Sequence, residues 1–164
     1  MSYPDPMYRG SAGEATATYR PTDQGPDLTY PNGNTVHYLG TSASTDGQFG
    51  LYRWEMGPAP SGPAPHFHRT ISESFYILSG RIRIHDGRGW LDTRSGDFVH
   101  VPAGGIHGFR NESGEPASML IHFAPGAPRE AYFEGIVGAA DLDEAARLRF
   151  YLDHDNIWVD DQGR

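Results

Sequence analysis

From Thr35 onward, short apolar runs recur along the chain, separated by Gly and Pro. Runs of this length with turn residues between them are typical of a β-sandwich or a β-barrel. The predicted strands are Thr35–Leu39, Gln48–Met56, Ser74–Leu78, Arg81–Asp86, Trp90–Asp92, Asp97–Val101, His107–Asn111 and Ala117–Phe123. The pattern therefore predicts one all-β domain over residues 35–125.

Strict alternation of apolar and polar residues is clearest between two turns, at Arg81-Ile82-Arg83-Ile84-His85. Successive side chains of a strand point to opposite faces of the sheet. We therefore expect Ile82 and Ile84 in the core and the three polar side chains in solvent. The flanking Ser79-Gly80 and Asp86-Gly87 steps supply the turns, because Gly takes a positive φ without penalty.

The two ends of the chain differ from this region in composition and in hydrophobic pattern. Residues 1–34 are rich in Pro, Gly, Ser, Thr and Asp and hold few aliphatic residues, so we expect a flexible arm or a strand that pairs with a neighbour. After Pro128 the apolar period becomes helical and predicts helices over Arg129–Val137 and Asp141–Asp153, the second opening with a capping box of Asp141 and Glu144. Residues 126–164 thus form a C-terminal helical extension, which either packs outside the barrel or closes over its mouth with its tail.

Composition removes several classes of function. The 164 residues carry a net charge of −8 and no cluster of basic residues, which argues against nucleic acid as a partner. The chain has no Cys, which excludes thiolate chemistry, and no Lys, which excludes a Schiff base on a side chain. It also has no apolar run of the length that a signal peptide or a membrane span needs, so we expect a cytoplasmic protein without a membrane partner.

Four residues have the spacing of a metal site. His66 and His68 lie two positions apart on an extended segment, so both imidazoles point to the same face. Glu73 begins the next strand, and His107 follows a turn that reverses the chain. Three nitrogens and one carboxylate oxygen suit one divalent transition ion, namely Ni, Co, Fe, Mn, Cu or Zn. The ligand set alone leaves the choice among these metals open.

The same residues resemble the two motifs of the cupin family. The stretch from His66 to Gly80 reads H-x-H-x4-E-x6-G, and the stretch from Gly96 to Asn111 reads G-x5-P-x-G-x2-H-x3-N. One departure lies upstream, where Pro60 stands at a position that is usually Gly and Gly62 follows nearby. The resemblance implies a cupin β jelly-roll barrel with the metal on His66, His68, Glu73 and His107. We expect Asn111 to bond backbone groups near the second motif.

Candidate walls of a substrate pocket are the aromatic and long apolar residues of the predicted strands. They are Tyr52, Trp54, Met56, Phe75, Ile77, Phe98, Phe109 and Met119, and His100 and His122 are candidates to touch a substrate or to support a ligand. The alternative for each is an ordinary place in the core or on the surface.

The resemblance extends to bacterial cupins with one copy of the motifs, among them quercetinase-like dioxygenases and polyketide-cyclase-type proteins. The leading hypothesis is a dioxygenase that adds dioxygen to an aromatic or enolic, flavonol-like small molecule, with Glu73 as both ligand and general base. The alternatives are a non-redox metal-dependent cyclase or isomerase, and a binding protein without catalysis. Because jelly rolls expose sheet edges, we also expect a homodimer, with the arm before Thr35 as the exchanged strand.

Overall fold

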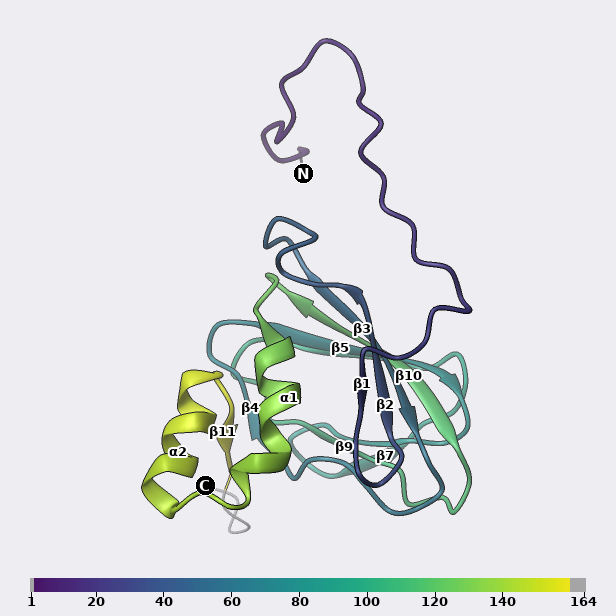
Figure 1. Cartoon of the computed structure of the whole chain (residues 1–164), viewed down its shortest axis with the longest axis vertical. Helices are drawn as coiled ribbons and strands as arrows, with labels where there is room; N and C mark the ends of the chain where they lie inside the picture. Colours follow the sequence, from purple (N-terminus) through teal and green to yellow (C-terminus); the bar gives the residue numbers. More distant parts are fainter. Residues whose placement is uncertain (1, 160–164) are drawn as a thin grey trace.

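Antiparallel strands build the body of the protein in the computed structural model, which describes residues 2–159 (Figure 1). The largest sheet has the order β1-β2-β3-β10-β5-β8, a second sheet has the order β7-β6-β9, and β11 pairs with β4. The strands are β1 Leu28–Thr29, β2 Thr35–Gly40, β3 Gly50–Met56, β4 His66–Phe67, β5 Ser72–Ser79, β6 Arg83–His85, β7 Trp90–Asp92, β8 Phe98–Val101, β9 Gly108–Arg110, β10 Ala117–Ala124 and β11 Ile157–Trp158. This architecture confirms the prediction of an all-β jelly roll with short C-terminal helices.

Alternating side chains of β3 and β10 form the centre of the core. Tyr52, Trp54 and Met56 are buried on β3, with the residues between them partly exposed. Their register partners on β10 are Ile121, Met119 and Ala117, which are also buried. Ile82 and Ile84 are fully buried as well, so the predicted inward face of that segment is confirmed.

One residue of each motif has a clear structural role. The side-chain amide of Asn111 donates to the carbonyls of Gly57 and Glu115, both at 2.8 Å, which confirms its expected bonds to the backbone. Gly80 has a φ of +71°, and a Cβ at this position would lie 2.5 Å from the carbonyl oxygen of Pro116. Only glycine fits such a turn without displacing its neighbour.

Helices α1 (Arg129–Ala139) and α2 (Glu144–Asp153) follow the last long strand and lie beside the barrel (Figure 1). The predicted capping box at Asp141 is wrong. The helix instead begins after Asp143, whose side chain accepts a hydrogen bond from the Ala146 amide at 2.8 Å. Asp143 is the better cap because its backbone is extended, which aims its carboxylate at the open amides of the first turn.

The N-terminal arm leaves the barrel and runs away from it over residues 2–26 (Figure 1). The segment from Leu28 to Asn34 belongs to the barrel instead, because β1 pairs with β2 of the same chain. Residue 1 of the predicted arm and residues 160–164 of the predicted tail lie outside the described residues. Between residues 2 and 159, no helix combines the length and the apolar character that a membrane crossing requires.

Candidate metal centre

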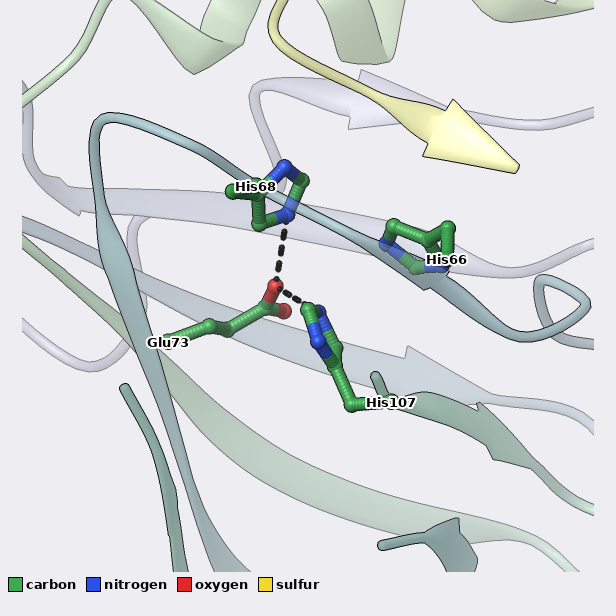
Figure 2. A group of neighbouring side chains, drawn as sticks. All are labelled: His66, His68, Glu73 and His107. Atoms are coloured by element: carbon green, nitrogen blue, oxygen red, sulfur yellow. Dashed lines mark hydrogen bonds and ion pairs between the residues drawn. The ribbon is translucent and has the colours of Figure 1, made fainter. Parts of the chain in front are cut away.

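Four buried side chains converge inside the barrel, and they are the four that the motif predicts (Figure 2). His66 lies on β4, His68 directly after it, Glu73 on β5 and His107 just before β9. The isolated bridge between His66 and His107 holds these two backbones together, with amide-to-carbonyl distances of 2.8 Å in both directions. One donor atom from each of the four residues lies within 4.8 Å of the others.

Each histidine bonds a backbone carbonyl through Nδ1. His66 Nδ1 lies 2.9 Å from the carbonyl of Ala64, and His107 Nδ1 lies 2.9 Å from that of Gly105. His68 Nδ1 contacts the carbonyl of Asp155. A carbonyl only accepts, so the hydrogen of each neutral imidazole resides on Nδ1 and the lone pair on Nε2. The three Nε2 atoms are therefore ready to act as metal ligands.

The Nε2 atoms of two histidines face the carboxylate of Glu73. Glu73 Oε2 lies 2.8 Å from His107 Nε2 and 3.1 Å from His68 Nε2 (Figure 2). A carboxylate oxygen and a neutral imidazole nitrogen both present lone pairs, so contacts this short need a cation between them, either a proton or a metal ion.

Burial and charge act together on these groups. Burial lowers the pKa of His66 to about 3, so its imidazole is neutral at physiological pH. Burial alone would raise the pKa of Glu73, but His107 and His68 hold it well below its ordinary value. Burial alone would lower the pKa of His107, but Glu73 raises it. The cluster thus holds one carboxylate charge in a buried place, which is costly unless a cation is paired with it.

The donor set fits one transition ion. Imidazole nitrogen and carboxylate oxygen together suit first-row metals better than calcium or magnesium, which prefer oxygen ligands alone. The bonds from Nδ1 to carbonyls also match the way metal-binding histidines are oriented by a second layer of partners. The four residues can therefore hold a metal ion.

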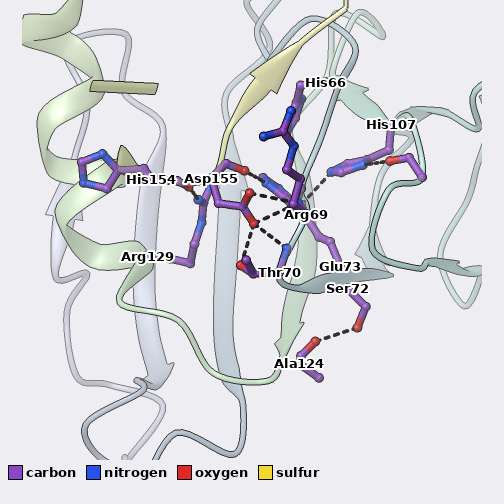
Figure 3. A network of polar contacts seen from close by, with 12 residues as sticks. His66, Arg69, Thr70, Ser72, Glu73, His107, Ala124, Arg129, His154 and Asp155 are labelled. Carbon is purple, nitrogen blue, oxygen red and sulfur yellow. Dashed lines mark hydrogen bonds and ion pairs between the residues drawn. The ribbon is translucent and has the colours of Figure 1, made fainter. Parts of the chain in front are cut away.

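The C-terminal extension supplies part of this second layer. Asp155 follows α2 in a left-handed conformation with a φ of 53°, and its own carbonyl accepts from His68. Its carboxylate accepts from the Arg69 and Thr70 amides at 2.8–3.0 Å and from the Thr70 hydroxyl at 2.7 Å (Figure 3). Asp155 therefore fixes the turn that carries His68 from two sides.

Strand β11 covers His66. Trp158 is the register partner of His66, and the centroids of their rings are 5.1 Å apart. The residues 154–158 thus touch two of the four ligands, although they lie outside the barrel domain that the sequence predicts.

A cavity of about 290 Å³ adjoins the cluster and includes His66 and Glu73 in its wall. The wall is mostly aromatic and apolar, with a few polar groups, as is usual for small-molecule sites. It is lined by Tyr30, Asn32, Asn34, Trp54, Met56, Ser61, Gly62, Pro63, His66, Glu73, Phe109, Ile121, Phe123, Arg129, Tyr132, Phe133, Ile136 and Trp158.

Among the predicted pocket residues, Trp54, Met56 and Phe109 line this cavity. Four others are buried in the core without reaching it, namely Tyr52, Phe75, Ile77 and Met119. The hydroxyl of Tyr52, for example, points to Glu130 of α1 at 2.5 Å.

The remaining three predicted pocket residues occupy the outer face of the barrel. Phe98 and His100 are exposed on β8, and His100 contacts the Ser74 hydroxyl at 2.9 Å. His122 lies between the buried Ile121 and Phe123 on β10 and stacks on Phe49. The alternation of a strand explains this placement, because neighbours of inward residues point outward.

Most of the cavity wall that the sequence analysis missed comes from outside the predicted barrel. Tyr30, Asn32 and Asn34 precede the first predicted strand, and Arg129, Tyr132 and Trp158 belong to the C-terminal extension. No motif marks these residues. The one available signal was the aromatic and polar character of these residues.

The comparisons with known proteins agree with this geometry. Residues 52–123 match the family model of the Cupin domain. Quercetin 2,3-dioxygenase from Bacillus subtilis is 33% identical over 82 residues, which cover 49% of this chain and 24% of the relative. The chain thus matches only about a quarter of that relative's length.

Two solved structures share the fold. KdgF from Halomonas sp. has a TM-score of 0.59 at 13% identity and covers 70% of this chain and 97% of its own. A predicted oxalate decarboxylase from Thermotoga maritima has a TM-score of 0.58 at 19% identity and covers 66% and 99%. Together with the two motifs and the jelly roll, the Cupin domain match shows that residues 52–123 form a cupin domain.

Proposed function

We propose that this protein is a metal-dependent enzyme that adds dioxygen to an aromatic or enolic small molecule. The observation that carries the proposal is the convergence of three Nε2 atoms, each with its Nδ1 bonded to a carbonyl, on the carboxylate of Glu73 beside an aromatic cavity. The similarity to quercetin 2,3-dioxygenase over 82 residues supports this chemistry over the alternatives.

His66, His68, Glu73 and His107 would hold the ion. When bound, a divalent transition ion would supply Lewis acidity and electron transfer between the substrate and dioxygen. In this reaction the organic substrate is oxidised, dioxygen is reduced, and both oxygen atoms enter the product.

The protein contributes a general base and an apolar cavity wall that excludes water. Glu73 lines the cavity and contacts His68 and His107 through Oε2 alone, so its other oxygen would take the proton of a substrate hydroxyl. Trp54, Phe109 and Phe133 surround the cavity with rings that favour a flat aromatic or enolic molecule over water. His66, whose pKa is lowered by burial, adds no positive charge that would repel the ion.

The test is oxygen consumption by protein loaded separately with Fe, Mn, Co, Ni, Cu or Zn. The substrates are a panel of flavonols and smaller ortho-hydroxy carbonyl compounds, and products are identified by mass spectrometry with labelled dioxygen. We expect uptake of one dioxygen per substrate and two labelled atoms per product with a redox-active metal.

The matched controls separate this proposal from its alternatives. Turnover under argon, or equal activity with zinc, would replace the dioxygenase by a Lewis-acid cyclase or isomerase. Tight binding of the panel with no product under any condition would instead identify a binding protein. His85→Ala, which removes an imidazole that is no part of the cluster, should retain full activity.

A further inference from the structure

Arg129 is a buried cation in the wall of the cavity. It is the first residue of α1, its exposed fraction is 4%, and it lines the cavity together with Glu73. Within residues 2–159, no carboxylate lies within ion-pair distance of its guanidinium. Arginine is rarely this buried without a negative partner.

The protein offsets only part of the cost of this charge. Nη1 donates to the carbonyl of His154 at 2.7 Å (Figure 3), and the guanidinium lies 4.3 Å from the ring centre of Tyr132 and 5.2 Å from that of Phe123. A carbonyl dipole and aromatic faces are favourable neighbours, but neither is a counter-ion. The carboxylates of Glu73 and Asp155 act on Arg129 only through longer-range electrostatic attraction. Glu73 contacts the histidine cluster, and Asp155 accepts hydrogen bonds from backbone amides.

Three buried N–H groups of cavity residues have no acceptor among the described residues. They are Nε of Arg129 and the indole Nε1 of Trp54 and Trp158. Buried donors in native proteins nearly always find an acceptor. All three are donors and need acceptor atoms, and the oxygen atoms of an anion are the strongest acceptors.

We propose that the substrate is a small aromatic or enolic carboxylic acid, bound as an anion with its carboxylate against Arg129. The planar guanidinium matches the two oxygens of a carboxylate. The ring or enol then lies among Trp54, Phe109 and Phe133, with a hydroxyl or oxo group toward the cluster. This assignment rests on the proposed function, because the ligand occupies the same cavity.

The size of the cavity agrees with such a compound. Its volume of about 290 Å³ is close to the lower end of the range of about 300–1,000 Å³ that is typical of ligand pockets. A molecule with one ring and a short polar substituent is therefore a better match than a larger flavonol.

The experiment compares 2-hydroxybenzoate with 2-hydroxybenzamide, which has nearly the same shape and hydroxyl but no carboxylate charge. Isothermal titration calorimetry under argon measures both affinities on metal-loaded and on chelator-treated protein. We expect the wild type to bind the acid about 10- to 100-fold more tightly than the amide, as is usual for hydrogen bonds to charged groups.

The variants assign this preference to one side chain. Arg129→Met keeps much of the packing on Tyr132 and Phe123 and should bind the two probes equally, whereas Arg149→Met removes an exposed arginine of α2 and should leave the preference unchanged. Arg129→Lys keeps a charge without the planar fork, so its preference should fall to an intermediate value. This variant decides the question if Arg129→Met does not fold.

The outcomes separate this inference from the proposed function. An acid preference that survives Arg129→Met, or no preference in the wild type, would overturn the assignment of a carboxylic acid. An acid preference that depends on Arg129 without any oxygen uptake would instead refute the dioxygenase and leave the anion site in place.

Discussion

At the scale of single residues, the hydrogen bonds of the three histidines orient the nitrogen atoms that can bind a metal ion. The carbonyls of Ala64, Gly105 and Asp155 each take one Nδ1 hydrogen, which directs the lone pair of every Nε2 toward the same region. Glu73 adds the one negative charge of the cluster. Its removal is therefore the most informative single substitution.

Glu73→Gln keeps the size of the side chain and removes its charge. The metal should then bind at least about 10-fold more weakly, and oxygen uptake should fall by about 10²- to 10⁴-fold because the base is lost. The metal-free protein should keep its melting temperature, since a glutamine amide can donate to a neutral Nε2. Elemental analysis, an oxygen electrode and calorimetry measure the three quantities.

The matched control is Glu115→Gln, which neutralises an exposed carboxylate outside the cluster and should change none of these values. A Glu73→Gln protein with the metal content and turnover of the wild type would exclude Glu73 from both roles.

The four clustered residues were predictable from the sequence because the motif fixes both residue type and spacing. His66 and His68 share a face through the period of a strand, and the turn at Gly104 returns the chain to them. Phe98, His100 and His122 were candidates for the pocket, but they lie on the outer face. An apolar run without clear alternation of apolar and polar residues does not indicate which alternate side chains of the strand point into the barrel.

At the scale of the elements, the turn between α2 and β11 is part of the site. Asp155 accepts hydrogen bonds from His68, Arg69 and Thr70, and Trp158 packs on His66. Strands of two residues such as β4 and β11 lack enough positions to show a period, so they were not predictable. The partnership of this segment with the ligands became visible only in the fold.

Asp155→Ala tests the contribution of this turn. Alanine removes the acceptor of the Arg69 and Thr70 amides and is strained at a φ of 53°, so we expect a loss of about 1–3 kcal/mol in the free energy of unfolding. The metal should bind about 10- to 100-fold more weakly, because the backbone carbonyl that orients His68 is then no longer held in place by the Asp155 carboxylate. Denaturant titration and competition with a chromophoric chelator give the two values.

Asp155→Asn serves as the matched variant. Asparagine tolerates the left-handed conformation and keeps one acceptor oxygen, so both losses should be smaller than for alanine. Equal metal affinity in all three proteins would show that the turn does not position His68.

At the scale of the whole molecule, the largest sheet ends at β1 and β8, which leaves two edges. Beside the β8 edge, Phe98 is 63% exposed and its register partner Tyr76 is 43% exposed. Exposed edges and apolar side chains favour association with another chain. The homodimer that exchanges the arm before Thr35 stays a prediction, and residues 2–26 are the part of that arm that lies outside the barrel.

Deleting residues 2–26 tests this prediction and leaves β1 intact. We expect a monomer by light scattering, with the melting temperature and metal content of the full chain, because the cavity wall at Tyr30, Asn32 and Asn34 remains. A dimer after this deletion would rule out exchange of the arm.

Deleting residues 2–34 provides the comparison. It also removes Asn34, whose side chain accepts from the Gly57 amide at 3.0 Å and donates to the Ser61 hydroxyl at 3.0 Å. This protein should be less soluble and should lose part of the cavity.

Residues 154–159 contact His66 and His68, so metal binding by the cluster and docking of this segment on the barrel are thermodynamically linked. If docking of residues 154–159 raises the affinity for the ion by some factor, the ion must favour docking by the same factor. Hydrogen–deuterium exchange should therefore slow at the amides of Asn156 and Val159 when metal is added, while the amides of β7 keep their rates. Unchanged exchange in the tail would mean that metal binding and docking of the tail are independent. Slower exchange would make the tail a reporter of metal binding, in an assay that needs no substrate.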